Sequence, residues 1–415
     1  MTGRFVLVLA ACLVFAGGAL AADDAPLLLQ SPTLSRTEVA FTYGGYLWSV
    51  PREGGDARQL TTGGHESSPI FSPDGKWIAF AGEYDGNRDV YIIPAEGGTP
   101  RRLTWHPNQD IPVAWTPDSK RVLFISDREA YADFTRLYTV SVEGGPADVL
   151  PMWRGFDAWY SPDASRIAYV PNIQWQGTSW KRYRGGQTTP IYILRLSDLS
   201  LERVPRENSN DSKPVWFGDT VYFLSDRNGP VSLFAYDTKA KTVKQLIENK
   251  GLDFKSLSAG PDALAYEQFG AIYLYDPASG KSRKMNVTIA GDLPATRAHY
   301  EKAGDKVAAA ALSPTGVRAV FEVHGDIFTV PGDKGDIRNV TRTTAVAERD
   351  PAWSPDGRWI AYFSDESGEY ALHLADQSGL GAVKKINLGN PPSYFYGPLW
   401  SPDSKNCLLY TSLEG

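Results

Sequence analysis

Short segments that alternate hydrophobic and polar residues, each preceded by a tight turn, recur along the whole chain. In the clearest copy, SPDGKWIAF at Ser72–Phe80, Pro-Asp-Gly sets the turn and the four residues from Trp77 predict a strand. A repeat of this length predicts an array of similar supersecondary units. The other copies are TPDSKRVLF (Thr116–Phe124), SPDASRIAY (Ser161–Tyr169), SPTGVRAVF (Ser313–Phe321), SPDGRWIAY (Ser354–Tyr362) and SPDSK (Ser401–Lys405), with weaker ones at Phe217–Phe223 and Gly260–Tyr266.

Each repeat predicts about four strands. The strand after the Pro-Asp-Gly turn leads into a second turn that often reads Ser-Asp-Arg, as at Ser126–Arg128 and Ser225–Arg227. A strand with an aromatic residue at a fixed place follows, for example Val90–Ile93. A Gly-Gly hairpin such as Gly97–Gly98 then leads to a last strand that ends like Arg102–Thr104. Four short strands per repeat is the content of one β-propeller blade.

The spacing of the repeats agrees with blades. Their turn positions are 44, 45, 56 and 43 residues apart, at Asp74, Asp118, Asp163, Asp219 and Asp262. Outside the N-terminal signal region, residues 1–22, no segment keeps apolar residues at helical spacing. This excludes a solenoid built of helices. We therefore expect an all-β fold, and we interpret each Ser-Pro-Asp as a turn and not as part of a nucleophilic site.

The repeats divide the chain into two propellers. We expect a six-bladed β-propeller over residues 25–286, a linker over 287–306, and an incomplete second β-propeller over 307–415 with its first two to three blades. The linker has no repeat signature. Two and a half blades cannot close a ring, so we expect the chain to continue. The last strand, Asn406–Tyr410, departs from the repeat pattern, and the sequence leaves open whether the final residues are native.

The first 22 residues predict a signal peptide. Arg4 is followed by the apolar run Phe5–Phe15 and by small residues that predict cleavage near Ala21 or Ala22. We therefore expect a periplasmic or secreted protein. A lipoprotein acylated at Cys12 is the alternative, but the apolar run continues beyond that cysteine.

Composition excludes several classes of protein. The 415 residues carry 42 Lys and Arg against 48 Asp and Glu, a net charge of −6, which argues against a nucleic-acid partner. Once Cys12 is cleaved off, Cys407 has no partner for an internal disulfide. The five histidines are scattered, and no HExxH, GxSxG, Walker or dinucleotide motif is present. We therefore assign no metal, no cofactor and no catalytic residue to this chain.

One insertion stands out as a candidate substrate-binding loop. Residues 170–190 of the fourth repeat read VPNIQWQGTSWKRYRGGQTTP, an aromatic and basic segment in an acidic chain. Arginine is well shaped to pair with a peptide carboxylate. The alternative is a packing loop in which an arginine pairs with an acidic residue of its own blade. The candidate binding residues are Trp180, Lys181, Arg182, Tyr183 and Arg184.

These features together resemble one known family. The segments that carry the resemblance are Leu27–Leu29, the WKxYRGG stretch Trp180–Gly186, Gly325–Pro331 and Arg349–Gly357. Over residues 25–405 the chain resembles the N-terminal part of the tricorn peptidases. The Ser-Pro-Asp-Gly repeats alone are shared with TolB and prolyl-oligopeptidase propellers, whereas WKxYRGG followed by a second propeller is more specific.

The resemblance implies a function for the longer protein. In that family a six-bladed propeller precedes a seven-bladed one, and both are thought to gate the passage of peptides to and from a serine peptidase core. The catalytic residues lie after the second propeller, so none falls on this sequence. The implied partners are peptides or unfolded polypeptide and the remainder of the same chain, and a homo-oligomer is left open.

Two other functions fit the repeats less well. A stand-alone TolB-like propeller would act as a protein-binding module in the cell envelope, but TolB has a small α/β domain before a single propeller. A prolyl-oligopeptidase or an amidohydrolase fusion would show a hydrolase domain after one propeller, whereas new blades begin here at Val307.

Overall fold

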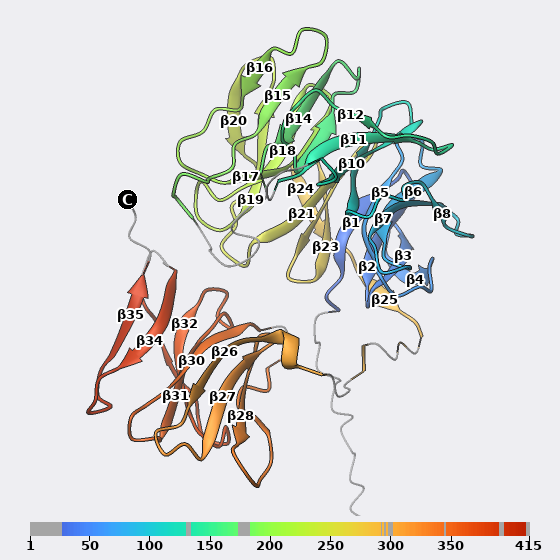
Figure 1. Ribbon diagram of the computed structural model, residues 1–415. Coiled ribbons are helices and arrows are strands. Elements are labelled where there is room, and N and C mark those ends of the chain that lie inside the picture. The colour runs from blue at the N-terminus through green and yellow to red at the C-terminus, as the bar shows by residue number, and fades with distance from the viewer. Residues whose placement is uncertain are drawn as a thin grey trace, which may run out of the picture.

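The computed structural model describes residues 27–129, 134–172, 183–291, 293, 296–297, 302–343, 346–389 and 394–411. These residues form strands throughout, as Figure 1 shows, and confirm the all-β prediction. The described part of the chain includes the short 3-10 turn η3 (Gly304–Lys306) and no α-helix. Within it, therefore, no helix has the length and apolar character needed to cross a membrane.

The first six sheets are each built on four antiparallel strands in chain order, and the first sheet has β25 (Val287–Ile289) as a fifth strand. In the first three sheets the strands are β1 (Gln30–Leu34), β2 (Glu38–Tyr43), β3 (Tyr46–Pro51) and β4 (Gly55–Gln59); β5 (Glu66–Phe71), β6 (Trp77–Gly82), β7 (Asp89–Pro94) and β8 (Arg101–Arg102); and β9 (Asp110–Trp115), β10 (Arg121–Ser126), β11 (Arg136–Ser141) and β12 (Asp148–Val149). In the next three they are β13 (Asp157–Tyr160), β14 (Arg166–Val170), β15 (Tyr192–Arg195) and β16 (Leu201–Arg203); β17 (Asp211–Phe217), β18 (Thr220–Ser225), β19 (Ser232–Asp237) and β20 (Thr242–Gln245); and β21 (Phe254–Ala259), β22 (Leu264–Gln268), β23 (Ala271–Asp276) and β24 (Lys281–Lys284).

These six sheets surround a common centre. The first strand of each sheet, which we call the innermost strand, contacts the innermost strand of the next sheet along the chain, and β21 contacts β1. Figure 1 shows the corresponding blue-to-yellow sheets side by side around the ring. Because each sheet is built from consecutive strands, the ring closes by side-by-side packing of the first and sixth sheets.

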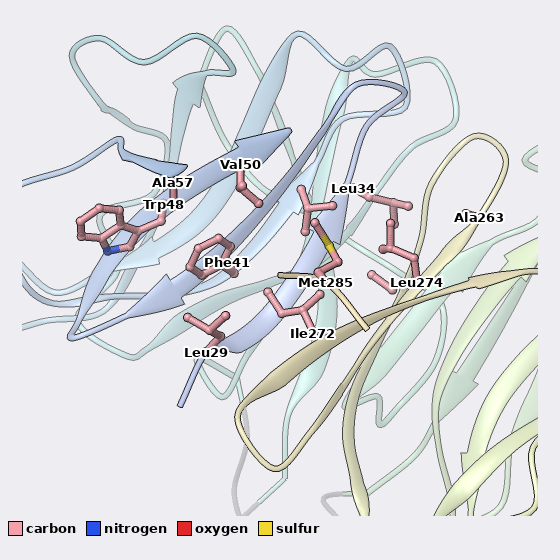
Figure 2. Close-up of a cluster of buried hydrophobic side chains, with 12 residues drawn as sticks. Leu29, Leu34, Phe41, Trp48, Val50, Ala57, Ala263, Ile272, Leu274 and Met285 are labelled. Atoms are coloured by element: carbon pink, nitrogen blue, oxygen red, sulfur yellow. The ribbon is translucent and has the colours of Figure 1, made fainter. Parts of the chain in front are cut away.

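The closing contact between the first and sixth sheets is apolar at its centre. Figure 2 shows Phe41 and Trp48 of the first sheet in one buried cluster with Ile272 and Leu274 of the sixth. Polar bonds reinforce this contact, since the Ser258 hydroxyl donates to the Pro32 carbonyl at 2.7 Å. The side chains of this cluster are less than 9% exposed, so the contact excludes water as a protein core does.

The chain returns to the first sheet after the sixth. Strand β25 (Val287–Ile289) pairs in parallel with β4, and Met285, just before it, is 4% exposed within the cluster of Figure 2. Residues 287–289 fall within the linker predicted from the sequence, because they carry no repeat motif. Strand β25 has three residues and pairs only with the edge strand β4 of the first sheet, so it needs no repeat motif. The repeat pattern in the sequence therefore does not reveal it.

The Ser-Pro-Asp motif is a turn, as the sequence predicts. The Ser72 hydroxyl donates to the Asp74 carboxylate at 2.6 Å and accepts the Trp77 amide at 3.0 Å, while Gly75 adopts a left-handed φ of 73°. The same serine-to-aspartate bond recurs at Ser161, Ser354 and Ser401. Each of these hydroxyls therefore closes a hairpin.

The Ser-Asp-Arg motif does more than turn the chain. In two sheets its arginine reaches back to a buried aspartate at the start of the innermost strand: Arg128 to Asp110 at 2.6 Å and Arg227 to Asp211 at 2.8 Å. Both aspartates are fully buried. Each guanidinium also lies over aromatic rings of its own sheet, for Arg227 at 5.2 and 5.3 Å from two ring centres. The arginine therefore neutralises a charge that the fold has buried.

A second group of sheets follows residue 303. It comprises two four-stranded sheets and a two-stranded one. The strands are β26 (Val307–Leu312), β27 (Arg318–Val323), β28 (Asp326–Pro331) and β29 (Arg338–Asn339); β30 (Glu348–Trp353), β31 (Trp359–Ser364), β32 (Ala371–Asp376) and β33 (Lys384–Ile386); and β34 (Phe395–Trp400) and β35 (Cys407–Thr411). Figure 1 shows this orange-to-red group as a body of its own.

One buried acid in this second group differs from its counterparts. Glu348 begins β30, as Asp110 begins β9, and it is 1% exposed. The position that supplies the arginine elsewhere holds Glu366, whose side chain pairs with Lys385 at 2.7 Å. Glu348 accepts a hydrogen bond from Thr343 at 2.7 Å, and within the described residues its Oε2 has no partner. Burial consequently raises the pKa of Glu348 to about 7.

This pKa predicts a pH-dependent stability. Between its ordinary value of 4.5 and about 7, the folded chain holds a proton on Glu348 that the unfolded chain has released. The stabilisation is therefore present at acidic pH and is lost as the pH rises toward 7. We expect Glu348→Gln to gain about 2.5 kcal/mol relative to the parent chain between about pH 5 and pH 8. Thermal unfolding across that range measures the gain, with the exposed Asp333→Asn as control; parallel curves for parent and Glu348→Gln would contradict the assignment.

Candidate functional site

A cavity of about 230 Å³ lies where the six innermost strands meet. Every one of the first six sheets contributes to its wall, so the cavity lies on the axis of the ring. One residue near the middle or start of each innermost strand faces it: Ser31, Ser68, Ile111, Asp157, Lys213 and Ser256.

Three of these lining residues occupy unusual backbone conformations. Ser31, Ser68 and Lys213 have left-handed φ values of 50°, 52° and 48°, although none is glycine. Each precedes a proline and lies at a shift in strand register, between β1 and β2, β5 and β6, and β17 and β18 respectively. Such bulges redirect a side chain out of the regular alternation of a strand. Here the redirected residues line the cavity.

A charged pair occupies one side of the cavity wall. The Lys213 ammonium lies 2.9 Å from Oδ1 of Asp157, which belongs to the neighbouring innermost strand. The Lys213 side chain is 39% exposed and that of Asp157 is 10% exposed. The ammonium also lies 6.0 Å from the centre of the Phe156 ring, within reach of a cation–π attraction. The pair is therefore accessible from the cavity on the lysine side.

A second carboxylate lies at the junction between the first and sixth sheets. Glu267 accepts the backbone amide of Ser31 at 2.9 Å and the Ser256 hydroxyl at 3.1 Å. Burial raises the pKa of Glu267, while these hydrogen bonds and the positive charges of Lys255 and Lys213 oppose the rise. Glu267 thus fixes the left-handed residue of the first sheet at the edge of the cavity.

The groups in the cavity wall are suited to binding a polar ligand. Within the described residues, no three His, Cys, Asp or Glu side chains are placed to hold a metal ion. The serines that line the cavity have no histidine among the residues around it, so the cavity wall shows no nucleophile with an adjacent base. The wall instead offers one ammonium, one open carboxylate and several hydroxyls, which can recognise a polar ligand by charge and hydrogen bonding.

The insertion of the fourth repeat lies partly outside the described residues. Of the five candidate binding residues, Trp180, Lys181 and Arg182 fall outside them. Tyr183 and Arg184 are described and form the base of the insertion, between β14 and β15. The Tyr183 carbonyl accepts the side-chain amide of Asn210 at 2.9 Å, which ties this base to the segment that leads into β17.

Arg184 has a structural partner. Its guanidinium lies 2.6 Å from Asp226, which is 1% exposed and follows β18 in the next sheet. One alternative from the sequence is an acidic partner in the same blade, whereas Asp226 belongs to the neighbouring blade. Because Asp211 also donates its amide to the Thr189 carbonyl, the base of the insertion is tied to the start of β17, two residues before Lys213. The insertion therefore arises at the end of the ring where the innermost strands begin.

Loss of the Arg184 side chain should destabilise the first six sheets. Arg184→Ala removes the guanidinium that pairs with the buried Asp226, while the hydrogen bonds from Asn210 to that carboxylate remain, and we expect a loss of about 2 kcal/mol. That corresponds to a melting temperature roughly 4–8 °C lower. Differential scanning calorimetry measures it, with the exposed Arg203→Ala as the matched control. An unchanged melting temperature would show that the pair contributes nothing.

Sequence reasoning missed the cavity residues. Asp157, Lys213 and Glu267 belong to none of the motifs by which the sequence analysis defines the repeat. A usable signal exists, however: Ser31, Ser68 and Lys213 each precede a proline at the same point of the repeat. Aligning the repeats on that proline would have pointed to this layer of the ring.

Four-stranded antiparallel sheets arranged around an axial cavity define the β-propeller class. Comparison with known proteins then gives the family. A family model described as the tricorn protease N-terminal beta propeller domain matches residues 26–281. The chain belongs to this family, which confirms the resemblance of its sequence to the N-terminal part of the tricorn peptidases.

Individual relatives agree with the family match. The chain is 26% identical over 362 residues to "Tricorn protease homolog 1" of Streptomyces coelicolor, covering 86% of this chain and 34% of that protein. It is 22% identical over 280 residues to "Tricorn protease" of Thermoplasma acidophilum, covering 65% of this chain and 25% of that protein. The chain thus spans about a third or less of the length of these curated relatives.

A solved structure supports the fold. The crystal structure of the tricorn protease superposes with a TM-score of 0.55 at 18% sequence identity, over 93% of this chain and 46% of that one. At this identity the likeness establishes the propeller fold and nothing about activity. The structural match covers 93% of this chain and therefore extends beyond the first six sheets into the second group.

Proposed function

We propose that this chain is the N-terminal propeller region of an exported tricorn-like serine peptidase, in which it gates the passage of peptides. The family match over residues 26–281 carries the proposal. The family's catalytic residues lie beyond the propellers, so the chain supplies the gate and the remainder of the longer protein supplies the chemistry. Its partners are then peptides or unfolded polypeptide and the rest of its own chain.

The proposed domain plan follows the sheets. A signal peptide covers residues 1–22, a six-bladed propeller covers 25–286, a linker covers 287–306, and a second propeller begins at 307. In support, the sixth sheet packs against the first and β25 returns to β4, so that nothing beyond Ile289 is needed to complete the first ring of sheets. The gating role is supported by the cavity on the axis of that ring.

The reading frame after residue 415 tests the assignment to a peptidase. We expect it to encode further blades, a PDZ-like segment and a serine peptidase core. A stop codon soon after the third new blade would overturn the proposal and favour a stand-alone binding propeller of the TolB kind. Export is tested separately, by mass spectrometry of the mature N-terminus in an envelope fraction, which should begin near Ala22.

A further inference from the structure

We propose that Asp157 and Lys213 form a binding site for zwitterionic α-amino acids and short peptides in the axial cavity. The inference rests on the proposed function, because it names the class of molecule that the passage would hold. The ligand's ammonium pairs with the Asp157 carboxylate, and its terminal carboxylate pairs with the Lys213 ammonium.

The first argument is the arrangement of charge. The two groups have opposite sign, come from adjacent innermost strands, and lie 2.9 Å apart in the wall of the same cavity. Because the Asp157 side chain is only 10% exposed, its carboxylate needs a positive partner, and a ligand ammonium can serve as that partner in place of Lys213. A ligand that carries both charges can therefore enter between the two groups and replace each contact with an equivalent one.

The second argument is that Asp157 keeps open acceptor capacity. The buried Asp211 accepts hydrogen bonds from Ser209, Ser225 and Arg227, whereas among the residues that the structure describes the Asp157 carboxylate has the Lys213 ammonium alone as a donor. A carboxylate has about four acceptor positions. The Asp157 side chain is 10% exposed, and its carboxylate can accept further hydrogen bonds from a ligand in the cavity.

The third argument is the strained geometry and the size of the cavity. Lys213 holds a left-handed φ of 48° before a proline, a conformation that persists only where its surroundings enforce it and that is common at ligand sites. The cavity of about 230 Å³ has the volume of several water molecules, at about 30 Å³ each. This volume suits a small peptide and excludes a folded domain.

Calorimetric titration of the chain with the dipeptide Ala-Ala tests the site. We expect binding to the parent chain and at least tenfold weaker binding of N-acetyl-Ala-Ala and of Ala-Ala-amide, because each derivative lacks one charge. Lys213→Gln should weaken the binding of Ala-Ala about tenfold and leave the binding of Ala-Ala-amide unchanged. Asp157→Asn should weaken the binding of Ala-Ala about tenfold and leave the binding of N-acetyl-Ala-Ala unchanged. Lys239→Gln is the matched control, since Lys239 forms an exposed pair with Asp219 in the same sheet.

Two outcomes would overturn the inference. One is the absence of Ala-Ala binding to the parent chain. The other is equal affinity for Ala-Ala and both blocked derivatives, and this comparison needs no variant and so does not depend on how a variant folds. If Ala-Ala does not bind but an obstruction of the cavity slows the full-length peptidase, the site is wrong and the gating proposal stands. If Ala-Ala binds as expected and obstruction has no effect, the gating proposal fails instead.

Discussion

Replacing Arg227 with alanine should lower the free energy of unfolding of the first six sheets by about 3–5 kcal/mol. The substitution leaves Asp211 buried at 0% exposure without its counter-charge. It also removes a guanidinium that lies over the rings of Phe223 and Phe234. Urea-induced unfolding followed by tryptophan fluorescence measures the loss.

The control and the rescue make this prediction specific. Arg195→Ala breaks an exposed pair with Asp198 at 3.3 Å in the fourth sheet and should change stability by less than about 0.5 kcal/mol. Combining Arg227→Ala with Asp211→Asn should recover part of the loss, because the buried charge is then gone. Equal stability of Arg227→Ala and Arg195→Ala would show that the buried pair does not hold the sheet together.

A chain that ends at Lys284 should be less stable than one that ends at Arg297 by about 4 kcal/mol or more. The shorter chain loses Met285, which is 4% exposed between the first and sixth sheets, and loss of a buried methionine side chain alone costs about 2–5 kcal/mol. It also loses β25 and the hydrogen bond from the Gly55 amide to the Asn286 carbonyl. The contact that closes the ring is therefore weakened at its outer edge.

Thermal unfolding of the two chains measures this difference. A third chain that ends at Ile289 keeps Met285 and β25 and should lie close to the longest one, which separates the closing contact from the segment that follows it. Near-ultraviolet circular dichroism shows whether the shortest chain retains fixed tertiary packing. Identical unfolding of all three chains would mean that the first six sheets close without the returning strand.

The sequence predicted the repeating parts of the fold because a repeat reports local chemistry. Turns such as Ser72–Gly75 depend on residues within a few positions of one another, so their motif is visible and its role is confirmed. The role of Arg227 was not visible, since its partner Asp211 lies 16 residues away and the motif around it reads as a turn. Strand β25 was missed for the same reason: its pairing with β4 spans most of the ring.

In the candidate site, too, local sequence features could be predicted and contacts between distant residues could not. The insertion around Arg184 attracted notice by composition, yet what Arg184 contacts depends on Asp226 of another sheet, which no local pattern shows. The cavity residues Asp157 and Lys213 are brought together only by the closure of the ring. Contacts of this kind are set by packing between repeats, and the repeat motif carries no information about them.

Reversible obstruction of the axial cavity tests the gating proposal most directly. In the full-length peptidase, with its other cysteines replaced, Ser68→Cys places a thiol in the cavity wall, and a bulky methanethiosulfonate reagent attaches there through a disulfide that a reductant removes. Ser279→Cys, on the exposed hairpin between β23 and β24, is the matched control. We predict that modification of Ser68→Cys lowers the rate of peptide hydrolysis at least tenfold and that reductant restores it, with no change in the control. Equal rates before and after modification of Ser68→Cys, with labelling verified by mass spectrometry, would contradict the proposal that peptides pass through this propeller.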